Sequence, residues 1–288
     1  MRALVFENSL PRLAATRVLS WITPRAFVGP TAPLRQRDVP EPALPADDWL
    51  LLRTRLCGIC GSDTKQVFLN GDLDNPMTAL ISFPQILGHE VVGTVERVGA
   101  GVTRRRIGER VVLNPWLSCA PRGLDPCTWC RRGDLAQCLC FTQGVVDPGI
   151  HTGNSRQASG GFAPLVPAHE SMCIPVPDDV PDEAAVLADP FSVSLHSILH
   201  SPPTPGGHAL VYGCGTLGLL AVAGRTIRAP DASGGEAGRA QRAALAPEPT
   251  PGGAAGRHHR RRTPAPLARA SDAERRRRRG VRHGRLGG

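Results

Sequence analysis

Four cysteines within twenty residues carry the strongest chemical signal in the sequence. They are Cys119, Cys127, Cys130 and Cys138, so a Cys-x-x-Cys pair is flanked on each side by a cysteine seven intervening residues away. Four thiolates match the tetrahedral coordination that zinc prefers, and a closed four-ligand site stabilises the loop folded around it. The spacing therefore predicts a structural zinc site. Cys140 is close enough in sequence to replace Cys138, and a metal-free cluster of buried thiols is the alternative interpretation.

A second group of potential metal ligands is dispersed along the chain. Cys57 and Cys60 occur in CGICGSD, His89 and Glu90 in LGHE, and Asp189 in ADPFSVSLH. Thiolate, imidazole and carboxylate donors suit a catalytic zinc, which takes three protein ligands and keeps a fourth position open. Spacing alone does not identify this set. A histidine between a glycine and a strand is more often structural, and an aspartate before a proline more often caps a helix.

A glycine-rich loop predicts the start of a dinucleotide-binding fold. Gly213, Gly215 and Gly218 stand in the sequence VYGCGTLG. They follow a predicted strand at 208–212 and open a predicted helix. Such glycines permit a tight turn, close approach of the backbone to a pyrophosphate and close packing of helix on strand, while the helix N-terminus favours the phosphates. Asp231 and Glu236 lie near the distance expected for a ribose-binding acid, but no strand pattern precedes them and neither is assigned that role.

The elements that would position these residues are short strands followed by helices. Strands broken by Gly and Pro are expected at 2–6, 49–56, 90–98, 109–113 and 162–166. This pattern predicts an all-β, barrel-like domain. The Pro-rich region 8–45 receives no element and is interpreted as an insertion between two early strands. From Pro181, acidic residues followed by Ala and Leu at helical spacing predict a helix that Pro190 kinks or splits. His196 and His200 are interpreted as ordinary residues of that helix.

The composition changes abruptly at about Ala223. Residues 225–288 contain 16 arginines and 5 acidic residues, but only five large aliphatic residues and no aromatic one. Such a segment cannot bury enough apolar surface to fold, and its composition is typical of a GC-rich gene translated in the wrong frame. We therefore predict a disordered, non-native tail. An Arg-rich arm that binds nucleic acid is the alternative.

Charge and cysteine content bound the partners and the compartment. Residues 1–224 contain 18 basic and 20 acidic residues, so the net charge of +9 belongs to the tail. The folded part thus gives no electrostatic reason to expect a nucleic-acid or membrane partner. Nine cysteines without a signal peptide or a long apolar span indicate a cytoplasmic protein whose clustered thiols hold metal.

Six strings of the sequence resemble, in order, the zinc-dependent medium-chain dehydrogenases, a family that includes alcohol, polyol and threonine dehydrogenases. They are GICGSD, GHEVVGTV, the four-cysteine loop, GGFAPLV, ADPFSVSLH and VYGCGTLG, and the resemblance covers about residues 45–223. It implies a mixed α/β chain. A GroES-like β-barrel catalytic domain would occupy 1–185, a helical connection and the start of a Rossmann domain 186–224, and the tail 225–288.

The resemblance also implies roles for individual residues. Cys60, His89 and Asp189 would bind the catalytic zinc, with Glu90 as a neighbouring group or an alternative ligand. Asp63 would hydrogen-bond the far nitrogen of His89, and Ser62 would relay the proton of the alcohol. Cys57 would be an ordinary strand residue. The spacer before His89 and the gap 120–126 between the first two clustered cysteines look longer than in many relatives, so substrate specificity is not transferred.

The family function is hydride transfer between the CH–OH group of an alcohol or polyol and NAD or NADP, with one catalytic and one structural zinc ion. The expected partners are a small alcohol or carbonyl substrate and, in the intact family, further copies of the chain. The alternative is a catalytically inactive zinc-binding fragment, because most of the dinucleotide-binding domain is not recognisable after Ala223. On that interpretation this chain does not turn over by itself.

Overall fold

The computed structural model describes residues 1–70, 79–202 and 208–228. All of them lie in a single contact unit that spans Met1–Leu245. The predicted disordered tail lies outside the described residues from position 229 onward. Helices in the described part of the chain are too short or too polar to cross a bilayer.

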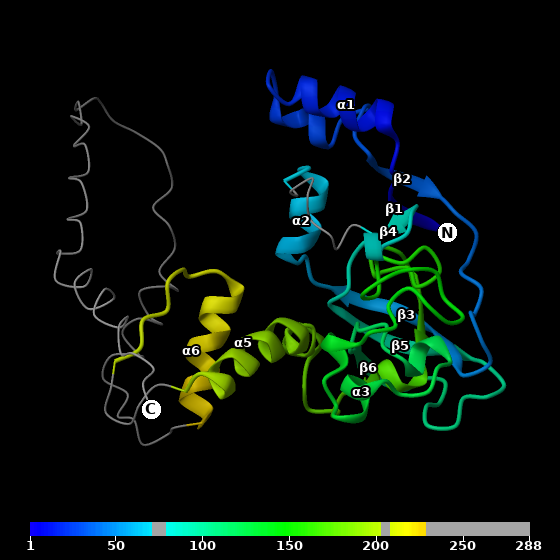
Figure 1. Cartoon of the computed structure of the whole chain (residues 1–288), viewed down its shortest axis with the longest axis vertical. Coiled ribbons are helices and arrows are strands. Elements are labelled where there is room, and N and C mark those ends of the chain that lie inside the picture. The colour runs from blue at the N-terminus through cyan, green and yellow to red at the C-terminus, as the bar shows by residue number, and fades with distance from the viewer. Residues whose placement is uncertain (71–78, 203–207, 229–288) are drawn as a thin grey trace, which may run out of the picture. The chain divides into compact units, whose positions relative to one another are not determined.

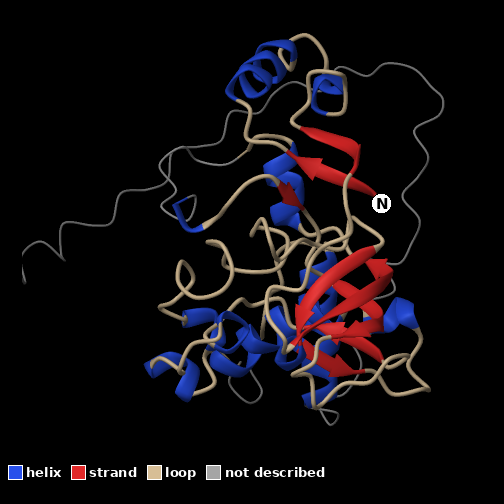
Figure 2. Cartoon of the chain, turned by 90° about the vertical axis from the view of Figure 1, so that its right-hand side faces the viewer, coloured by secondary structure: helices blue, strands red, loops and turns tan. Residues whose placement is uncertain are grey.

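Five antiparallel strands form the larger sheet, in the order β7-β3-β5-β6-β8. Figure 1 labels three of them, β3, β5 and β6. They are β3 (Trp49–Cys57), β5 (Val91–Val98), β6 (Arg110–Leu113), β7 (Leu165–His169) and β8 (Cys173–Pro175). Figure 2 shows this sheet as a strongly curved layer with loops and short helices beside it. The strands predicted at 49–56, 90–98 and 109–113 are thereby confirmed, as is the mixed α/β class.

The core of this sheet is built on the apolar run that opens β3. Trp49, Leu50, Leu51 and Leu52 are all buried. A continuous apolar run is typical of a strand that is covered on both faces. Val91 and Val95 of β5, Val111 of β6 and Val166 of β7 pack against it in one cluster. This buried strand ends at Cys57 and leads into the loop that carries Cys60.

Three antiparallel strands form a smaller sheet in the order β2-β1-β4. β1 (Arg2–Phe6) pairs along its whole length with β2 (Leu34–Asp38) and at its end with β4 (Gln85–Ile86). The strand predicted at 2–6 is confirmed, and the segment between β1 and β2 is an insertion between two early strands.

The absence of any element in region 8–45 was a wrong expectation. The insertion contains helix α1 (Leu10–Leu19) and the 3-10 helix η1 (Pro24–Phe27). Pro11 stands in the first turn of α1, where a missing N–H group costs no hydrogen bond. The helix buries only Thr16, whose hydroxyl donates to the carbonyl of Thr31 at 2.9 Å. Leu10, Leu13 and Val18 recur at helical spacing, but Leu10 and Val18 are exposed and Pro11 stands within the run.

Strand β7 begins later than the predicted 162–166. The backbone N–H of Phe162 donates to Leu87 at 3.0 Å, and its carbonyl accepts from the N–H of Leu4 at 3.0 Å. Phe162 therefore bonds to the loop before His89 and to β1, and contact with β3 starts at Ala163 and Pro164, whose carbonyls accept from Thr54. Regular pairing with β3 begins only beyond Pro164, where Leu165 faces Arg53.

The predicted helix after Pro181 is split, but not at Pro190. It forms α4 (Asp182–Ala185) and α5 (Ala188–His200), with Val186 at the C-terminus of α4. Pro190 lies in the first turn of α5, where its missing N–H is tolerated. Its ring would clash with the carbonyl four residues earlier in a continuous helix, and that residue is Val186. The break therefore falls one turn before the proline.

The predicted strand at 208–212 is not formed, whereas the helix after the glycine loop is. Residues 208–214 have no regular structure, and Leu210 and Tyr212 are 90% and 99% exposed. Helix α6 (Thr216–Arg228) follows and packs on α5, where the hydroxyl of Ser194 donates to the carbonyl of Leu217 at 2.9 Å. A buried parallel strand requires neighbouring strands, and the described residues provide none beside 208–212.

The β3 core generates a stability prediction. Leu52 is 0% exposed, whereas Leu56 on the same strand is 36% exposed. Leu52→Ala is expected to lower the free energy of unfolding by about 2–5 kcal/mol because it leaves a cavity in a packed core. Leu56→Ala, the matched control, should cost about 1 kcal/mol or less. Denaturant unfolding measures both changes. Equal losses of stability would contradict the position of Leu52 in the hydrophobic core.

Candidate metal centres

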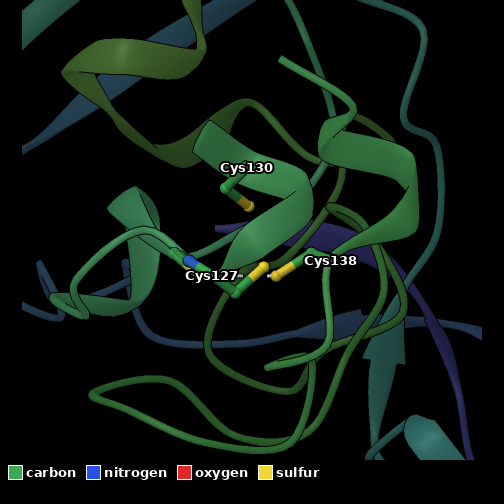
Figure 3. Close-up of side chains that lie close together, drawn as sticks. Cys127, Cys130 and Cys138 are labelled. Atoms are coloured by element: carbon green, nitrogen blue, oxygen red, sulfur yellow. Dashed lines mark hydrogen bonds between the residues drawn. The ribbon is translucent and has the colours of Figure 1, made fainter. Parts of the chain in front are cut away.

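The four clustered cysteines converge in the structure. The sulfur atoms of Cys119, Cys127, Cys130 and Cys138 all lie within 4.8 Å of one another. Short helices place them. Cys119 precedes η3 (Ala120–Arg122), and Cys138 follows η4 (Leu135–Gln137). Cys127 precedes α3 (Thr128–Arg131), which contains Cys130. Figure 3 shows the sulfur atoms of Cys127, Cys130 and Cys138 directed at a common space.

Hydrogen bonds from the backbone point at two of these sulfur atoms. The N–H of Cys127 donates to Sγ of Cys119, and the N–H of Cys140 donates to Sγ of Cys138, each at 3.3 Å. Cys140 thus contributes a donor next to the group, while its own thiol stands outside the four that converge. The geometry favours Cys138 over Cys140 as the fourth member.

The thiols of this group differ strongly in acidity. Backbone N–H groups of Cys130 and Leu139 lower the pKa of Cys127 to about 6. Burial raises the pKa of Cys130 to about 12 and that of Cys138 to about 11. A divalent cation with a preference for sulfur would replace the protons on the high-pKa thiols. Four converging sulfur donors therefore fit zinc.

A second group consists of Cys60, His89 and Glu90, whose ligand atoms also lie within 4.8 Å of one another. Cys60 caps helix α2 (Gly61–Val67), and the two other residues lie between β4 and β5. His89 and Glu90 are buried, whereas Cys60 is half-buried. One thiolate, one imidazole and one carboxylate make a three-ligand set of the kind that leaves a fourth position for a substrate.

Gly58 allows the carboxylate of Glu90 to enter this group. A Cβ atom at Gly58 would collide with Oε2 of Glu90, so a side chain at this position would displace the carboxylate. The N–H of Gly58 also donates to the carbonyl of Glu90 at 2.8 Å. The glycine of GICGSD is therefore required by close approach, not by its backbone angles.

The acid–base properties of the second group are coupled. A hydrogen bond with His89 lowers the pKa of Cys60. Burial by itself would lower the pKa of His89, but the hydrogen bond with Cys60 and the charge of Asp63 outweigh it and raise that pKa. Burial also raises the pKa of Glu90. The thiol and the imidazole thus share a proton that a bound cation would replace.

Asp63 does not form the expected hydrogen bond to His89. Its Oδ1 lies 3.9 Å from Nδ1 of His89, and that buried nitrogen has no hydrogen-bond partner. The Asp63 carboxylate instead accepts the N–H of Cys60 at 2.9 Å and the N–H of Gly88 at 3.3 Å. It therefore acts on the imidazole through its charge and through the backbone.

Asp189 lies near the second group without joining it. Its charge raises the pKa of both His89 and Glu90, but its carboxylate is not among the atoms that converge within 4.8 Å. Burial raises the pKa of Asp189 itself. Of the two carboxylates considered from the sequence, Glu90 is the one that the structure brings to Cys60 and His89.

Cys57 and Ser62 stand close in sequence to Cys60, one at the end of β3 and the other in α2. Cys57 ends β3, and burial raises its pKa to about 12, which describes a packed, neutral thiol. Ser62 is exposed in the first turn of α2 and hydrogen-bonds Cys60, which lowers the pKa of that thiol further. His196 and His200 stack on each other with ring centroids 3.9 Å apart on α5, away from both groups of converging ligands.

His151 belongs to the second site and was missed in the sequence. Its ring centroid lies 4.5 Å from that of His89, and its Nδ1 is 2.7 Å from the carbonyl of Thr152. Burial lowers its pKa to about 4, so the ring is neutral. The residue lies in an irregular loop with no motif around it, and no sequence pattern identifies it.

The glycine loop has part of the geometry that a dinucleotide requires. Gly213 has φ +107°, a conformation that favours glycine. A Cβ atom at Gly218 would collide with the carbonyl of Gly213, so the helix start and the turn approach closely. Gly215 faces open space, as a residue beside a ligand would, and Cys214 is exposed rather than packed.

Part of the chain is similar to known alcohol dehydrogenases. Residues 46–178 match the family model of the alcohol dehydrogenase GroES-like domain. The chain is 33% identical to (R,R)-butanediol dehydrogenase of Saccharomyces cerevisiae over 199 residues, which cover 64% of this chain and 50% of that protein. The chain spans about half the length of the curated relatives it matches.

Two solved structures extend the likeness. The alcohol dehydrogenase TADH from Thermus sp. ATN1 is 26% identical with a TM-score of 0.57, covering 79% of this chain and 55% of that one. A short chain alcohol dehydrogenase (rspB) from Escherichia coli CFT073, solved with NADH, is 25% identical with a TM-score of 0.53, covering 77% and 52%.

The four-cysteine group generates a metal prediction. Cys130→Ser is expected to remove one metal ion per chain and to lower the melting temperature, because structural zinc contributes folding free energy. Elemental analysis and thermal unfolding measure the two effects. Cys214→Ser, which changes an exposed thiol outside both groups, is the control and should alter neither. Full metal content in the Cys130→Ser variant would contradict the assignment.

Proposed function

We propose that the chain belongs to the zinc-dependent medium-chain alcohol dehydrogenases, whose GroES-like domain residues 46–178 match, and that it is an oxidoreductase acting on a small alcohol or polyol. The convergence of Cys60, His89 and Glu90 carries this proposal. These three residues supply a thiolate, an imidazole and a carboxylate, in addition to the separate group of four thiols. Three mixed ligands are typical of a catalytic zinc site, whereas four thiolates are typical of a structural one.

Zinc at the three-ligand site would supply a Lewis acid that makes the substrate hydroxyl more acidic. We assign Cys60, His89 and Glu90 as its ligands and Asp189 as a nearby charge. The preference for Glu90 rests on its place in the converging group and on Gly58, which leaves room for its carboxylate. Four thiolates of the other group would hold the second zinc ion.

The protein's own residues orient the reactants and move the proton. Ser62 is exposed and hydrogen-bonds Cys60, so its hydroxyl is placed to accept a proton from a substrate and pass it to solvent. His151 covers the neighbouring side of His89, and the ring of Trp116 packs edge to face on His151. This wall would exclude water from that side of the imidazole.

We propose NAD or NADP as the hydride acceptor. Gly213, Gly215 and Gly218 precede α6, whose N-terminus would favour a pyrophosphate. Support comes from the positive φ of Gly213 and from the close approach at Gly218. The NADH bound to the rspB structure belongs to that protein, and its fold likeness makes the same cofactor class a reasonable candidate here.

A second candidate function is metal binding without turnover. The observation that favours it is the missing strand at 208–212, where Leu210 and Tyr212 are exposed. A dinucleotide normally rests on the ends of several parallel strands. Binding of NADH distinguishes the two functions.

The ligand assignment predicts a difference between two carboxylates. Glu90→Gln should weaken metal binding at the Cys60 site about tenfold or more, because an amide is a poorer ligand than a carboxylate. Asp189→Asn should change it by less than about threefold, since the residue acts only through its charge. Competition with a chromophoric chelator measures both affinities. The reverse order would assign Asp189 as the ligand.

The activity prediction uses the full chain loaded with zinc. NADH should form from NAD and a small secondary alcohol, and Cys60→Ala should abolish this reaction, whereas Ile107→Ala, at an exposed position outside the metal groups and the glycine loop, should leave it intact. Absorbance at the nicotinamide band follows the reaction, and fluorescence quenching follows NADH binding. A chain that loads both metal ions but neither binds NADH nor oxidises any alcohol or polyol would establish the second candidate function.

A further inference from the structure

A fully buried arginine lies beside the four-cysteine group. Arg122 is 0% exposed and ends η3, in the gap between Cys119 and Cys127. Its backbone N–H donates to the carbonyl of Cys119 at 3.1 Å, and its own carbonyl accepts from the N–H of Val145 at 3.1 Å. The gap that looks longer than in many relatives therefore inserts a cation between the cysteines and loop 143–149.

All hydrogen-bond partners of the guanidinium are neutral. It donates to the carbonyls of Leu117 (2.9 Å), Gln143 (2.6 Å), Val146 (3.0 Å), Asp147 (3.3 Å) and Gly149 (2.7 Å). These five bonds satisfy its donors and hold the loop in place, but they leave its charge without compensation. A buried cation is costly unless an anion lies near it.

No carboxylate among the described residues forms an ion pair with Arg122, and the charge of Asp147 acts on it less than the charges of the nearby thiols do. The Asp147 carboxylate pairs instead with Nε of Arg156 at 2.8 Å. The acidic groups that act most on Arg122 are thiols. Burial lowers the pKa of its guanidinium, and negative charge on Cys138, Cys140 and Cys119 opposes that effect.

We propose that Arg122 is the counter-charge of the four-cysteine site, stabilising it as a metal-bound tetrathiolate and being stabilised by it in turn. A divalent ion with four thiolates carries a net charge of −2, which supplies the missing anion. The inference rests on the proposed binding of zinc by these cysteines. The coupling free energy is reciprocal: bound metal stabilises the buried charge of Arg122 by the same amount by which that charge strengthens metal binding. Removal of the charge must therefore weaken metal binding.

The rival explanation is that Arg122 only holds the loop through its five hydrogen bonds. Two substitutions separate charge from hydrogen bonding. Arg122→Lys keeps the charge and loses most of the fork of donors, whereas Arg122→Gln keeps an amide donor and loses the charge. If Arg122 acts through its charge, Arg122→Lys preserves metal affinity better than Arg122→Gln. If it acts only through its hydrogen bonds, the two variants bind metal equally or Arg122→Gln binds it better.

The experiment is a cobalt titration of the full chain in a Cys60→Ser background, so that only the four-cysteine site reports. Sulfur-to-cobalt charge-transfer absorption identifies a tetrathiolate site. Arg122→Gln is expected to weaken cobalt binding about tenfold or more, and Arg122→Lys by less than about threefold. Arg105→Gln is the control, because Arg105 also donates to a carbonyl, that of Cys173 at 2.9 Å, but has Glu109 as its partner.

Each outcome decides the proposal. Equal weakening in both Arg122 variants, no weakening in either, or failure of both to fold with metal in excess would assign Arg122 to the scaffold and overturn it. Absence of a tetrathiolate spectrum in the chain with Arg122 intact would overturn zinc binding by the cysteines and this inference together. A normal spectrum there, with unchanged variants, would overturn the counter-charge alone.

Discussion

The buried carboxylate of Asp63 joins the two loops that carry the second group of ligands. One oxygen accepts the N–H of Cys60 at 2.9 Å, and the other accepts the N–H of Gly88 at 3.3 Å. The first of these backbone groups belongs to the residue that supplies the thiol, and the second directly precedes the imidazole. The carboxylate therefore sets how far Cys60 lies from His89, and its charge also raises the pKa of that histidine.

The two candidate metal centres differ in how much the sequence reveals. The four thiols lie within twenty residues, so their spacing alone predicts a site, and short helices bring them together. Cys60 and Glu90 come from distant segments, and only a family resemblance identifies them. The choice between Glu90 and Asp189, and the presence of His151, depend on how loops fold, which spacing does not encode.

The same distinction holds for the fold. The apolar run at 49–52 predicts a buried strand because burial on both faces leaves a local signature. Helix α1 has no such signature of burial in its sequence, since Thr16 is the only residue that it buries. The strand at 208–212 was wrong for the opposite reason: its pattern is right, but a strand exists only when neighbouring strands pair with it. Pro190 ends a helix one turn before itself, a shift that follows from its ring and the carbonyl of Val186.

The long connection from β6 to β7 links the two centres physically. Its part after η4, residues 138–164, contains no helix or strand, and the buried backbone there must find hydrogen-bond partners elsewhere. Arg122 supplies them next to the four thiols and bonds the carbonyl of Gly149. The Asn154 side chain then accepts the N–H groups of Ile150 (2.9 Å) and His151 (3.0 Å). His151 in turn packs on His89, so the connection that carries the four cysteines also contacts the second group of candidate ligands.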